Sequence, residues 1–341
     1  MKKNRQSEVV VITGASAGIG RATVRAYARR GASIGLLARG QEGLEGARRE
    51  VEKLGAQAIV VPTDVADPEQ VESAAVTVEK AFGPIDIWIN NAMVSVLSPV
   101  KDMTAAEFQR VTNVTYLGYV YGTLSALRRM LPRDRGVIIQ VGSALTYRAI
   151  PLQSAYCGAK HAIKGFTESL RSELIHDGSQ VRLSMVHLPG VNTTQFGWIK
   201  SRLPYEPQPV PPIYQPEVMA RAIVWAADHD RRELWVGMPT VKTIVGEKFI
   251  PGLLDHYLAE VAYTGQQTNI PIKPDRADNL FAPVPQDRGA HGDFDNQAQS
   301  TSFQLWASMN RAWLAVAGVG CLLSLGLAIK QSQGNRSRIN N

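Results

Sequence analysis

VVVITGASAGIG, residues 9–20, is the stretch of sequence that decides the fold. A run of β-branched residues ends in a glycine-rich loop, and a helical pattern follows as far as Arg30. Glycine lets the backbone turn tightly and approach a pyrophosphate, which then lies at the positive end of the helix. Glycine-rich loops are common in tight turns, but this one stands between a first strand and a helix, which predicts a dinucleotide site. The expected contacts are Gly14, Gly18, Ile19 and Gly20.

Beyond this loop, residues 8–237 alternate Val- and Ile-rich runs with helical patterns, which is typical of a parallel sheet covered by helices. The runs are apolar on both faces, as buried parallel strands are. The expected strands are residues 8–12, 33–37, 58–62, 85–90, 137–141, 181–186 and 233–236. We therefore predict an α/β fold, a Rossmann-type doubly wound parallel sheet of about seven strands, followed by an irregular extension and a single apolar helix.

Two helices carry clear start signals. Asp67 before Pro68 is typical of an N-cap followed by a first-turn proline, and an apolar stripe then runs to Gly83. Thr104 with Glu107 matches a capping box, which predicts a helix from there to about residue 130.

The length of 341 residues suggests about two domains at roughly 150 residues each. Apolar residues make up 45% and charged residues 20%, which excludes disorder for most of the chain. The patterns nevertheless predict one catalytic domain over 7–240, a C-terminal extension over 241–303 and a linker over 304–311. Within the extension, the polar residues 265–303 are expected to wrap or tether. Residues 204–216 hold six prolines and form either a stiff connection or part of a lid.

The C-terminal end carries an uncharged apolar run over residues 312–329, between Arg311 and Lys330. Eighteen such residues are about the minimum for crossing a hydrocarbon core of about 30 Å, and Trp313 lies near one edge, where indoles favour the interface. We predict a transmembrane or membrane-anchoring helix over 312–330, with the catalytic domain in the cytosol; a buried core helix is the alternative. This orientation conflicts with the positive-inside tendency, because three basic residues then cross: Lys330, Arg336 and Arg338.

Several motifs beyond the glycine loop occur in a fixed order. They are Asp64-Val65 after the third strand, Asn90-Asn91-Ala92 after the fourth, Ser143 after the fifth, Tyr156-x3-Lys160, and Pro189-Gly190 after the sixth. With the Gly-x3-Gly-x-Gly loop, this set resembles the short-chain dehydrogenase/reductase family over about residues 7–237. Met93 departs from the family pattern, which has glycine there. The resemblance implies that the cofactor is held by Asp64, Val65, Asn91, Ala92, Tyr156, Lys160, Pro189, Gly190, and Thr193 or Thr194.

Tyr156 and Lys160 are four residues apart and share one face of a helix. A free tyrosine has a pKa near 10, and a lysine ammonium and the positive nicotinamide ring both lower that pKa by favouring the phenolate. The resemblance implies that Tyr156 exchanges a proton with the substrate oxygen, that Lys160 also holds the nicotinamide ribose, and that Ser143 polarises the carbonyl.

One position departs from the family's catalytic set. The family usually has an asparagine three residues before a helix glycine, completing a proton relay, whereas Thr115 stands three residues before Gly118. Asn113 is nearby but lies about 200° away around an α-helix. This sequence therefore lacks the asparagine that completes the family's relay.

Cofactor choice is a question of charge. The second predicted strand ends without an acidic residue and with Arg39, whose guanidinium matches the geometry of a 2′-phosphate. Arg39, with a hydroxyl contact from Ser16, predicts NADP(H) rather than NAD; a merely solvated arginine is the alternative.

The function expected is hydride transfer between NADP(H) and a small-molecule carbonyl or secondary alcohol, which we expect to be lipophilic because of the anchor. An NADP-binding regulatory or scaffold protein is the alternative. The net charge of +7 comes from dispersed basic residues without a nucleic-acid motif, so we expect no nucleic-acid partner. His187 is expected to be structural, Cys157 to have no role, and no metal site is predicted. The resemblance also implies a homodimer or homotetramer.

Overall fold

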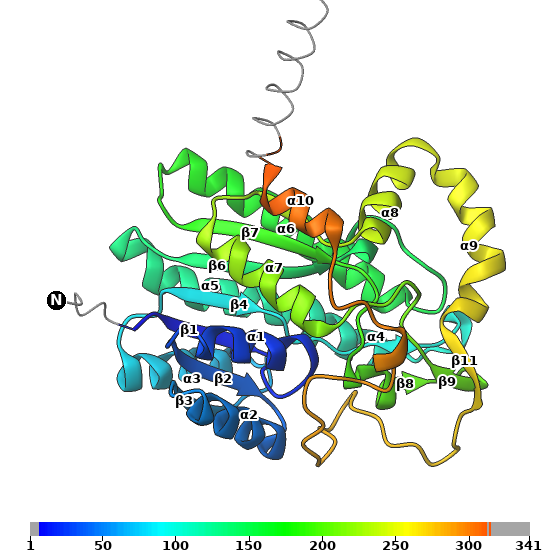
Figure 1. Ribbon diagram of the computed structural model, residues 1–341, viewed down its shortest axis with the longest axis horizontal. Helices are drawn as coiled ribbons and strands as arrows, with labels where there is room; N and C mark the ends of the chain where they lie inside the picture. Colours follow the sequence, from blue (N-terminus) through cyan, green and yellow to red (C-terminus); the bar gives the residue numbers. More distant parts are fainter. Residues whose placement is uncertain (1–6, 312–313, 315–341) are drawn as a thin grey trace, which may run out of the picture. The chain divides into compact units, whose positions relative to one another are not determined.

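The computed structural model describes residues 7–311 and 314 (Figure 1). The chain divides into two compact units, of which the first ends at Ser302 and the second begins at Phe303. The second unit contains the helix α10, Phe303–Met309.

Within this described part, a seven-stranded parallel sheet has the order β10-β7-β6-β4-β1-β2-β3. Its strands are β1 Val9–Thr13, β2 Ser33–Ala38, β3 Gln57–Pro62, β4 Ile87–Asn90, β6 Val137–Ser143, β7 Arg182–Leu188 and β10 Glu233–Trp235. All seven predicted strands are confirmed, with ends that shift by one or two residues. The inner strands are buried on both faces, whereas β3 is partly exposed because it forms the sheet edge.

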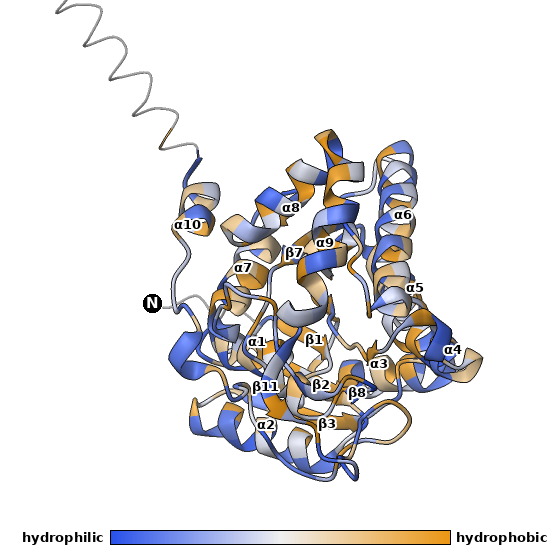
Figure 2. Ribbon diagram, turned by 90° about the vertical axis from the view of Figure 1, so that its right-hand side faces the viewer, coloured by the Kyte–Doolittle hydropathy of each residue, from blue (hydrophilic) through white to orange (hydrophobic). Residues whose placement is uncertain are grey.

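Helices cover both faces of the sheet (Figure 1). One face carries α1 Gly18–Ala28, α2 Gln41–Lys53 and α7 Pro216–Asp228. The other carries α3 Pro68–Phe82, α5 Gly118–Met130 and α6 Ser154–His176. In Figure 2 the helices alternate hydrophilic and hydrophobic turns, as expected where one face packs on a sheet.

The predicted N-cap at Asp67 and the predicted capping box at Thr104 and Glu107 are both confirmed. Asp67 accepts hydrogen bonds from the backbone N–H groups of Glu69 and Gln70 at the start of α3. Thr104 and Glu107 form the complete capping box of α4, Ala105–Thr112. The helix then continues through a π-helical segment, Asn113–Leu117, before α5. The α-helical angle used for Asn113 therefore does not apply, because π-type bonding changes the turn there.

Within the residues described, four short strands form two small two-stranded sheets in addition to the main sheet. β5 Val96–Leu97 pairs with β8 Lys200–Ser201, and β9 Tyr205–Pro207 pairs with β11 Gln267–Pro271. Short helical turns of the 3₁₀ type cover Val100–Asp102, Leu131–Arg133, Ala144–Thr146, Thr194–Gly197 and Asp295–Gln297. The proline-rich segment 204–216 includes β9, and Tyr214 bridges Val191 and Gln299, so this segment is tied down on two sides.

The irregular extension predicted for residues 241–303 is wrong over its first part. Two helices stand there, α8 Met238–Phe249 and α9 Pro251–Gly265, and each has a proline in its first turn. Ile244 and Ala262 are buried, but most of the large apolar residues of these helices are exposed, with Phe249 80% and Leu253 65% accessible, so no regular apolar stripe marks the helices in the sequence. After β11, residues 272–294 have no regular secondary structure, as their polar composition suggests.

Helix α10, Phe303–Met309, covers most of the residues predicted as a linker, 304–311. Gln, Leu, Ala and Met in this stretch are all favourable helix formers. The anchor predicted over 312–330 lies outside the described residues. None of the helices within the described ranges is both long enough and apolar enough to span a bilayer.

Candidate functional site

The glycine loop lies at the carboxyl end of β1 and leads into α1. Gly14 and Gly18 have φ values of 69° and 56°, which side chains disfavour. A Cβ on Gly20 would lie 2.0 Å from the Gly14 carbonyl oxygen, so Gly20 serves close packing within the loop. Ala17 provides no side-chain cap for α1, which leaves this helix N-terminus suited to an anion.

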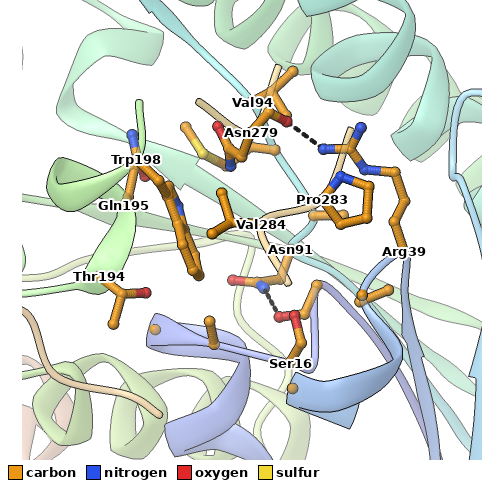
Figure 3. A pocket seen from close by; sticks show the side chains of 18 of the residues that line it. Ser16, Arg39, Asn91, Val94, Thr194, Gln195, Trp198, Asn279, Pro283 and Val284 are labelled. Atoms are coloured by element: carbon orange, nitrogen blue, oxygen red, sulfur yellow. Dashed lines mark hydrogen bonds between the residues drawn. The ribbon is translucent and has the colours of Figure 1, made fainter. Parts of the chain in front are cut away.

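A cleft runs along the carboxyl ends of the strands beside this loop (Figure 3). The predicted cofactor residues that line it are Gly14, Ser16, Gly18, Ile19, Arg39, Asp64, Val65, Asn91, Ala92, Thr193 and Thr194. Sequence reasoning missed other lining residues from distant segments, chiefly Val94, Val114, Gln195, Trp198, Asn279, Pro283, Val284 and Gln286. Gly20, Pro189, Gly190 and the three predicted catalytic residues are not part of its lining.

Gly190 has a packing role at the edge of this region. A Cβ there would lie 2.4 Å from the Val210 carbonyl oxygen, so only glycine lets the proline-rich segment approach so closely. The Gly190 carbonyl also accepts a hydrogen bond from the Tyr214 N–H at 3.0 Å.

Asn91 braces the glycine loop. Its side-chain amide donates to the Thr13 and Gly14 carbonyls at 2.9 and 3.4 Å. In return the Thr13 hydroxyl accepts from the N–H groups of Asn91 and Ala92. These contacts fix the end of β4 against the loop.

Asp64, expected to contact adenine, is held by the protein. One carboxylate oxygen accepts from Arg110 at 2.6 Å, and the other accepts from the Ala66 N–H at 3.0 Å. Asp64 lines the cleft with its carboxylate already engaged.

Arg39, expected to meet a 2′-phosphate, has partners from the far end of the chain. One terminal nitrogen donates to the carbonyls of Leu280 and Phe281 at 3.3 and 2.9 Å, and the other donates to that of Asn279. Burial lowers the pKa of Arg39, and the charge of nearby Arg110 adds to this effect. The arginine is therefore not merely solvated.

Thr194 supplies an indication that a ligand belongs in the cleft. Its hydroxyl oxygen is buried and has no hydrogen-bond partner among the residues that the structure describes. Buried polar groups are normally paired, and a cofactor carboxamide would pair this one. Both Thr193 and Thr194 line the cleft, so lining alone does not choose between them.

The three predicted catalytic residues come from β6 and α6. Ser143 is the last residue of β6, and Tyr156 and Lys160 occupy successive turns at the start of α6. β6 pairs with β4, whose end leads directly into Asn91 and the cleft. The Lys160 Nζ atom lies 5.6 Å from the centre of the Tyr156 ring, as the four-residue spacing predicts.

The protein surroundings of Tyr156 by themselves oppose a lowered pKa. Burial raises the pKa of Tyr156 well above its ordinary value, and a hydrogen bond with the Ser143 side chain only partly offsets this. Buried Lys160 instead donates to the Val141 carbonyl at 2.7 Å and to the Tyr119 hydroxyl at 3.1 Å. Burial lowers the pKa of Lys160 to about 7, which weakens its charge as a partner for a phenolate.

Thr115, at the position of the family's relay asparagine, is fully buried. Its hydroxyl donates to the Val94 carbonyl at 2.8 Å and accepts from the Val94 N–H at 3.1 Å. Because its one proton is already committed, this hydroxyl cannot donate to a relay water.

A buried network that sequence reasoning missed lies behind Ser143. His187 is fully buried, with Nδ1 3.2 Å from the Ser143 carbonyl oxygen and Nε2 3.3 Å from a Glu233 carboxylate oxygen. Tyr147 donates to that same oxygen at 2.6 Å. Burial raises the pKa of Glu233, but hydrogen bonds from His187 and Tyr147 outweigh it and hold the pKa far below its ordinary range. The structural role expected for His187 stays a prediction.

The remaining expectations concern thiols and metals. Burial raises the pKa of the Cys157 thiol to about 11, which makes it unreactive at neutral pH. No group of metal-ligating side chains occurs in the ranges that the structure describes.

Comparisons with known proteins agree with this architecture. The family model described as short chain dehydrogenase matches residues 8–202. The uncharacterized oxidoreductase YxnA of Bacillus subtilis is 34% identical over 281 residues, which are 82% of this chain and 79% of that protein. Dehydrogenase/reductase SDR family member 7 of Homo sapiens is 36% identical over 170 residues, 49% of this chain and 50% of that protein.

Among solved structures, an alcohol dehydrogenase from the archaeon Thermococcus sibiricus, complexed with 5-hydroxy-NADP, is similar in fold. It is 26% identical, with a TM-score of 0.58, and the match covers 67% of this chain and 96% of that one. The seven-stranded parallel sheet, the glycine loop and these matches together establish that the chain is an oxidoreductase of the short-chain dehydrogenase family.

Proposed function

We propose that this protein transfers a hydride between NADP(H) and a carbonyl or secondary alcohol, with Tyr156 as the general acid and base. The observation that carries this proposal is the gathering of Ser143, Tyr156 and Lys160 where β6 ends, next to the strand that leads into the cleft. The glycine loop, the start of α1 without a side-chain cap, and the unpaired Thr194 hydroxyl fit a dinucleotide.

Each catalytic residue has a separate task in this proposal. When bound, the nicotinamide supplies or accepts the hydride. The Tyr156 hydroxyl exchanges a proton with the substrate oxygen, and the Ser143 hydroxyl donates to that oxygen and polarises it. Lys160 holds the nicotinamide ribose. When Lys160 is protonated, its positive charge favours the phenolate form of Tyr156.

The preference for NADP(H) over NAD(H) rests on Arg39. β2 does not end in an acidic residue. Arg39 lines the cleft, and its guanidinium group is suited to binding a phosphate. The Thermococcus sibiricus enzyme that resembles this fold holds an NADP analogue. Ser16, also in the cleft lining, adds a hydroxyl beside the loop.

The substrate proposed is lipophilic and reaches the protein at a membrane. The apolar residues 312–330 would anchor the chain, with the catalytic domain on the cytosolic side. α8 and α9 add exposed apolar side chains, among them those of Phe249 and Leu253, and Figure 2 colours parts of both helices as hydrophobic. Assembly into a dimer or tetramer follows from family resemblance and is part of the same proposal.

A regulatory NADP-binding protein without turnover is the second candidate. Two observations favour it, namely the raised pKa of Tyr156, caused chiefly by burial, and the committed hydroxyl of Thr115. Against it stands the complete set of Ser143, Tyr156 and Lys160, because binding alone requires no proton donor.

The deciding experiment compares wild type with Tyr156→Phe as full chains in mild detergent. NADPH oxidation is followed with aliphatic, aromatic and steroid-like ketones, and NADPH affinity is measured separately by fluorescence. We expect turnover to fall about 100-fold or more while the NADPH Kd changes less than about twofold. Tyr257→Phe, an exposed tyrosine on α9, is the matched control.

Two results would decide against catalysis through Tyr156. A Tyr156→Phe variant as fast as wild type would refute the proton-transfer role. Tight NADPH binding by wild type without turnover of any ketone would favour the regulatory candidate.

A further inference from the structure

Residues 279–289, which we call the strap, cross the cofactor cleft although they lie far from it in sequence. They belong to the irregular segment that follows β11, drawn in orange at the lower edge of Figure 1. Neither a motif nor a periodic pattern marks them, and the family match ends at residue 202.

Two arginines hold the first part of the strap beside β2 and α4. Arg39 donates to three consecutive strap carbonyls, and Arg110 donates to the Leu280 carbonyl at 3.1 Å. Leu280 itself is fully buried and joins the core cluster that includes Val65 and Val114. Apolar burial and charged donors therefore fix this end together.

A second set of contacts holds the other end on the glycine loop. The Asp287 carboxylate pairs with the buried guanidinium of Arg21 at 3.2 and 3.3 Å. Arg21 also donates to the Ser16 carbonyl at 2.9 Å, so one side chain joins strap and loop. The Gly289 carbonyl accepts from the Gly18 N–H at 3.1 Å.

Between these two ends the strap forms part of the cleft wall. Asn279, Pro283, Val284 and Gln286 line the cleft opposite the glycine loop. Figure 3 shows Pro283 beside Arg39, and Val284 between Trp198 and Asn91. Arg288 contacts the cleft residue Trp198, with its guanidinium carbon 5.6 Å from the Trp198 ring centre.

We propose that the strap is the outer wall of the cofactor site, and that cofactor enters and leaves only when the strap detaches from Arg21 and the glycine loop. This inference rests on the proposed use of a dinucleotide in this cleft. The ion pair of Asp287 with Arg21 is the latch. Strap contacts add to cofactor affinity, and strap opening sets the rate of release.

The test weakens the latch and measures cofactor binding without turnover. Asp287→Asn removes the charge, while Arg21 keeps Glu50 and two backbone carbonyls as partners. Asp293→Asn, an exposed acid further along the same segment, makes the same change of charge at a residue that does not line the cleft. NADPH dissociation is followed by stopped-flow fluorescence on chasing with excess NADP⁺, and Kd by titration.

We expect Asp287→Asn to release NADPH roughly 5- to 10-fold faster and to bind it correspondingly more weakly, as loss of one charge-assisted contact implies. Asp293→Asn should match wild type. Hydrogen exchange at residues 279–289 should slow when NADPH binds.

Three outcomes would overturn the inference. Unchanged release in Asp287→Asn would show that the strap does not retain cofactor. Tighter NADPH binding by Asp287→Asn would show that the strap competes with cofactor for the cleft. Equal effects of Asp287→Asn and Asp293→Asn on NADPH release would show that only the net charge of the protein matters. Absence of NADPH binding by wild type would instead refute the proposed function on which the inference rests.

Discussion

The substitution Arg39→Ala distinguishes two roles of Arg39, namely binding the 2′-phosphate of NADPH and holding the strap. In the structure its terminal nitrogens donate to three neutral carbonyls of residues 279–281. A phosphate that takes two of these bonds replaces neutral acceptors with a charged one. Charged hydrogen bonds contribute about 1.5–3 kcal/mol each, against about 0.5–1.5 kcal/mol for neutral ones. Two exchanged bonds therefore favour the phosphate by about 2–3 kcal/mol, or roughly 30- to 150-fold in Kd.

The assay compares the Kd values of NADPH and NADH for wild type and Arg39→Ala. Loosening of the strap affects both cofactors alike, so the ratio of the two Kd values isolates the phosphate contact. We expect that ratio to change roughly 30- to 150-fold, with Arg39→Lys in between because it keeps the charge and loses the forked geometry. Arg48→Ala, on the exposed side of α2, is the control for general loss of positive charge. An equal loss for NADPH and NADH would refute the phosphate role and leave Arg39 as a strap anchor alone.

Two further predictions concern stability. Burial raises the pKa of Glu50, but hydrogen bonds from Arg25 and Arg21 outweigh this effect and lower the pKa to about 2. The ionised Glu50 carboxylate therefore stabilises the fold above about pH 4.5, and this stabilisation is lost as the pH falls toward 2. Urea midpoints should show Glu50→Gln less stable than wild type at pH 7 and nearly equal to it near pH 2, whereas a constant gap would contradict the reasoning; Glu52→Gln is the exposed control. Gly122→Ala should cost about 2–4 kcal/mol, because its Cβ would lie 2.2 Å from Asn90 Oδ1 and 2.7 Å from Trp88 Nε1, which are hydrogen-bonded to each other. Gly165→Ala on α6 meets no atom within 4 Å and should stabilise by about 0.5–1 kcal/mol, so equal unfolding midpoints for the two variants would count against the packing argument.

The sheet and the helix starts were predictable because their signals are local. Continuous Val and Ile runs require burial on both faces, and Asp67 and Thr104 bond backbone groups two or three residues away. The glycine loop was predictable for the same reason, since Gly14 and Gly18 need φ values that other residues avoid. α8 and α9 gave no such signal, because most of their large apolar side chains, such as Phe249 and Leu253, are exposed and do not form a buried stripe.

The sequence by itself determined the seven-stranded sheet, the dinucleotide loop, and the spacing that places Tyr156 beside Lys160. Only the tertiary structure decided what those residues touch. Arg39 meets carbonyls some 240 positions away, and Arg21 meets Asp287 266 positions away. The physical reason is that a hydrogen bond requires two groups to meet in space, while sequence patterns report only what each residue needs from its neighbours. Burial likewise raises the pKa of Tyr156 through surroundings that several distant segments assemble.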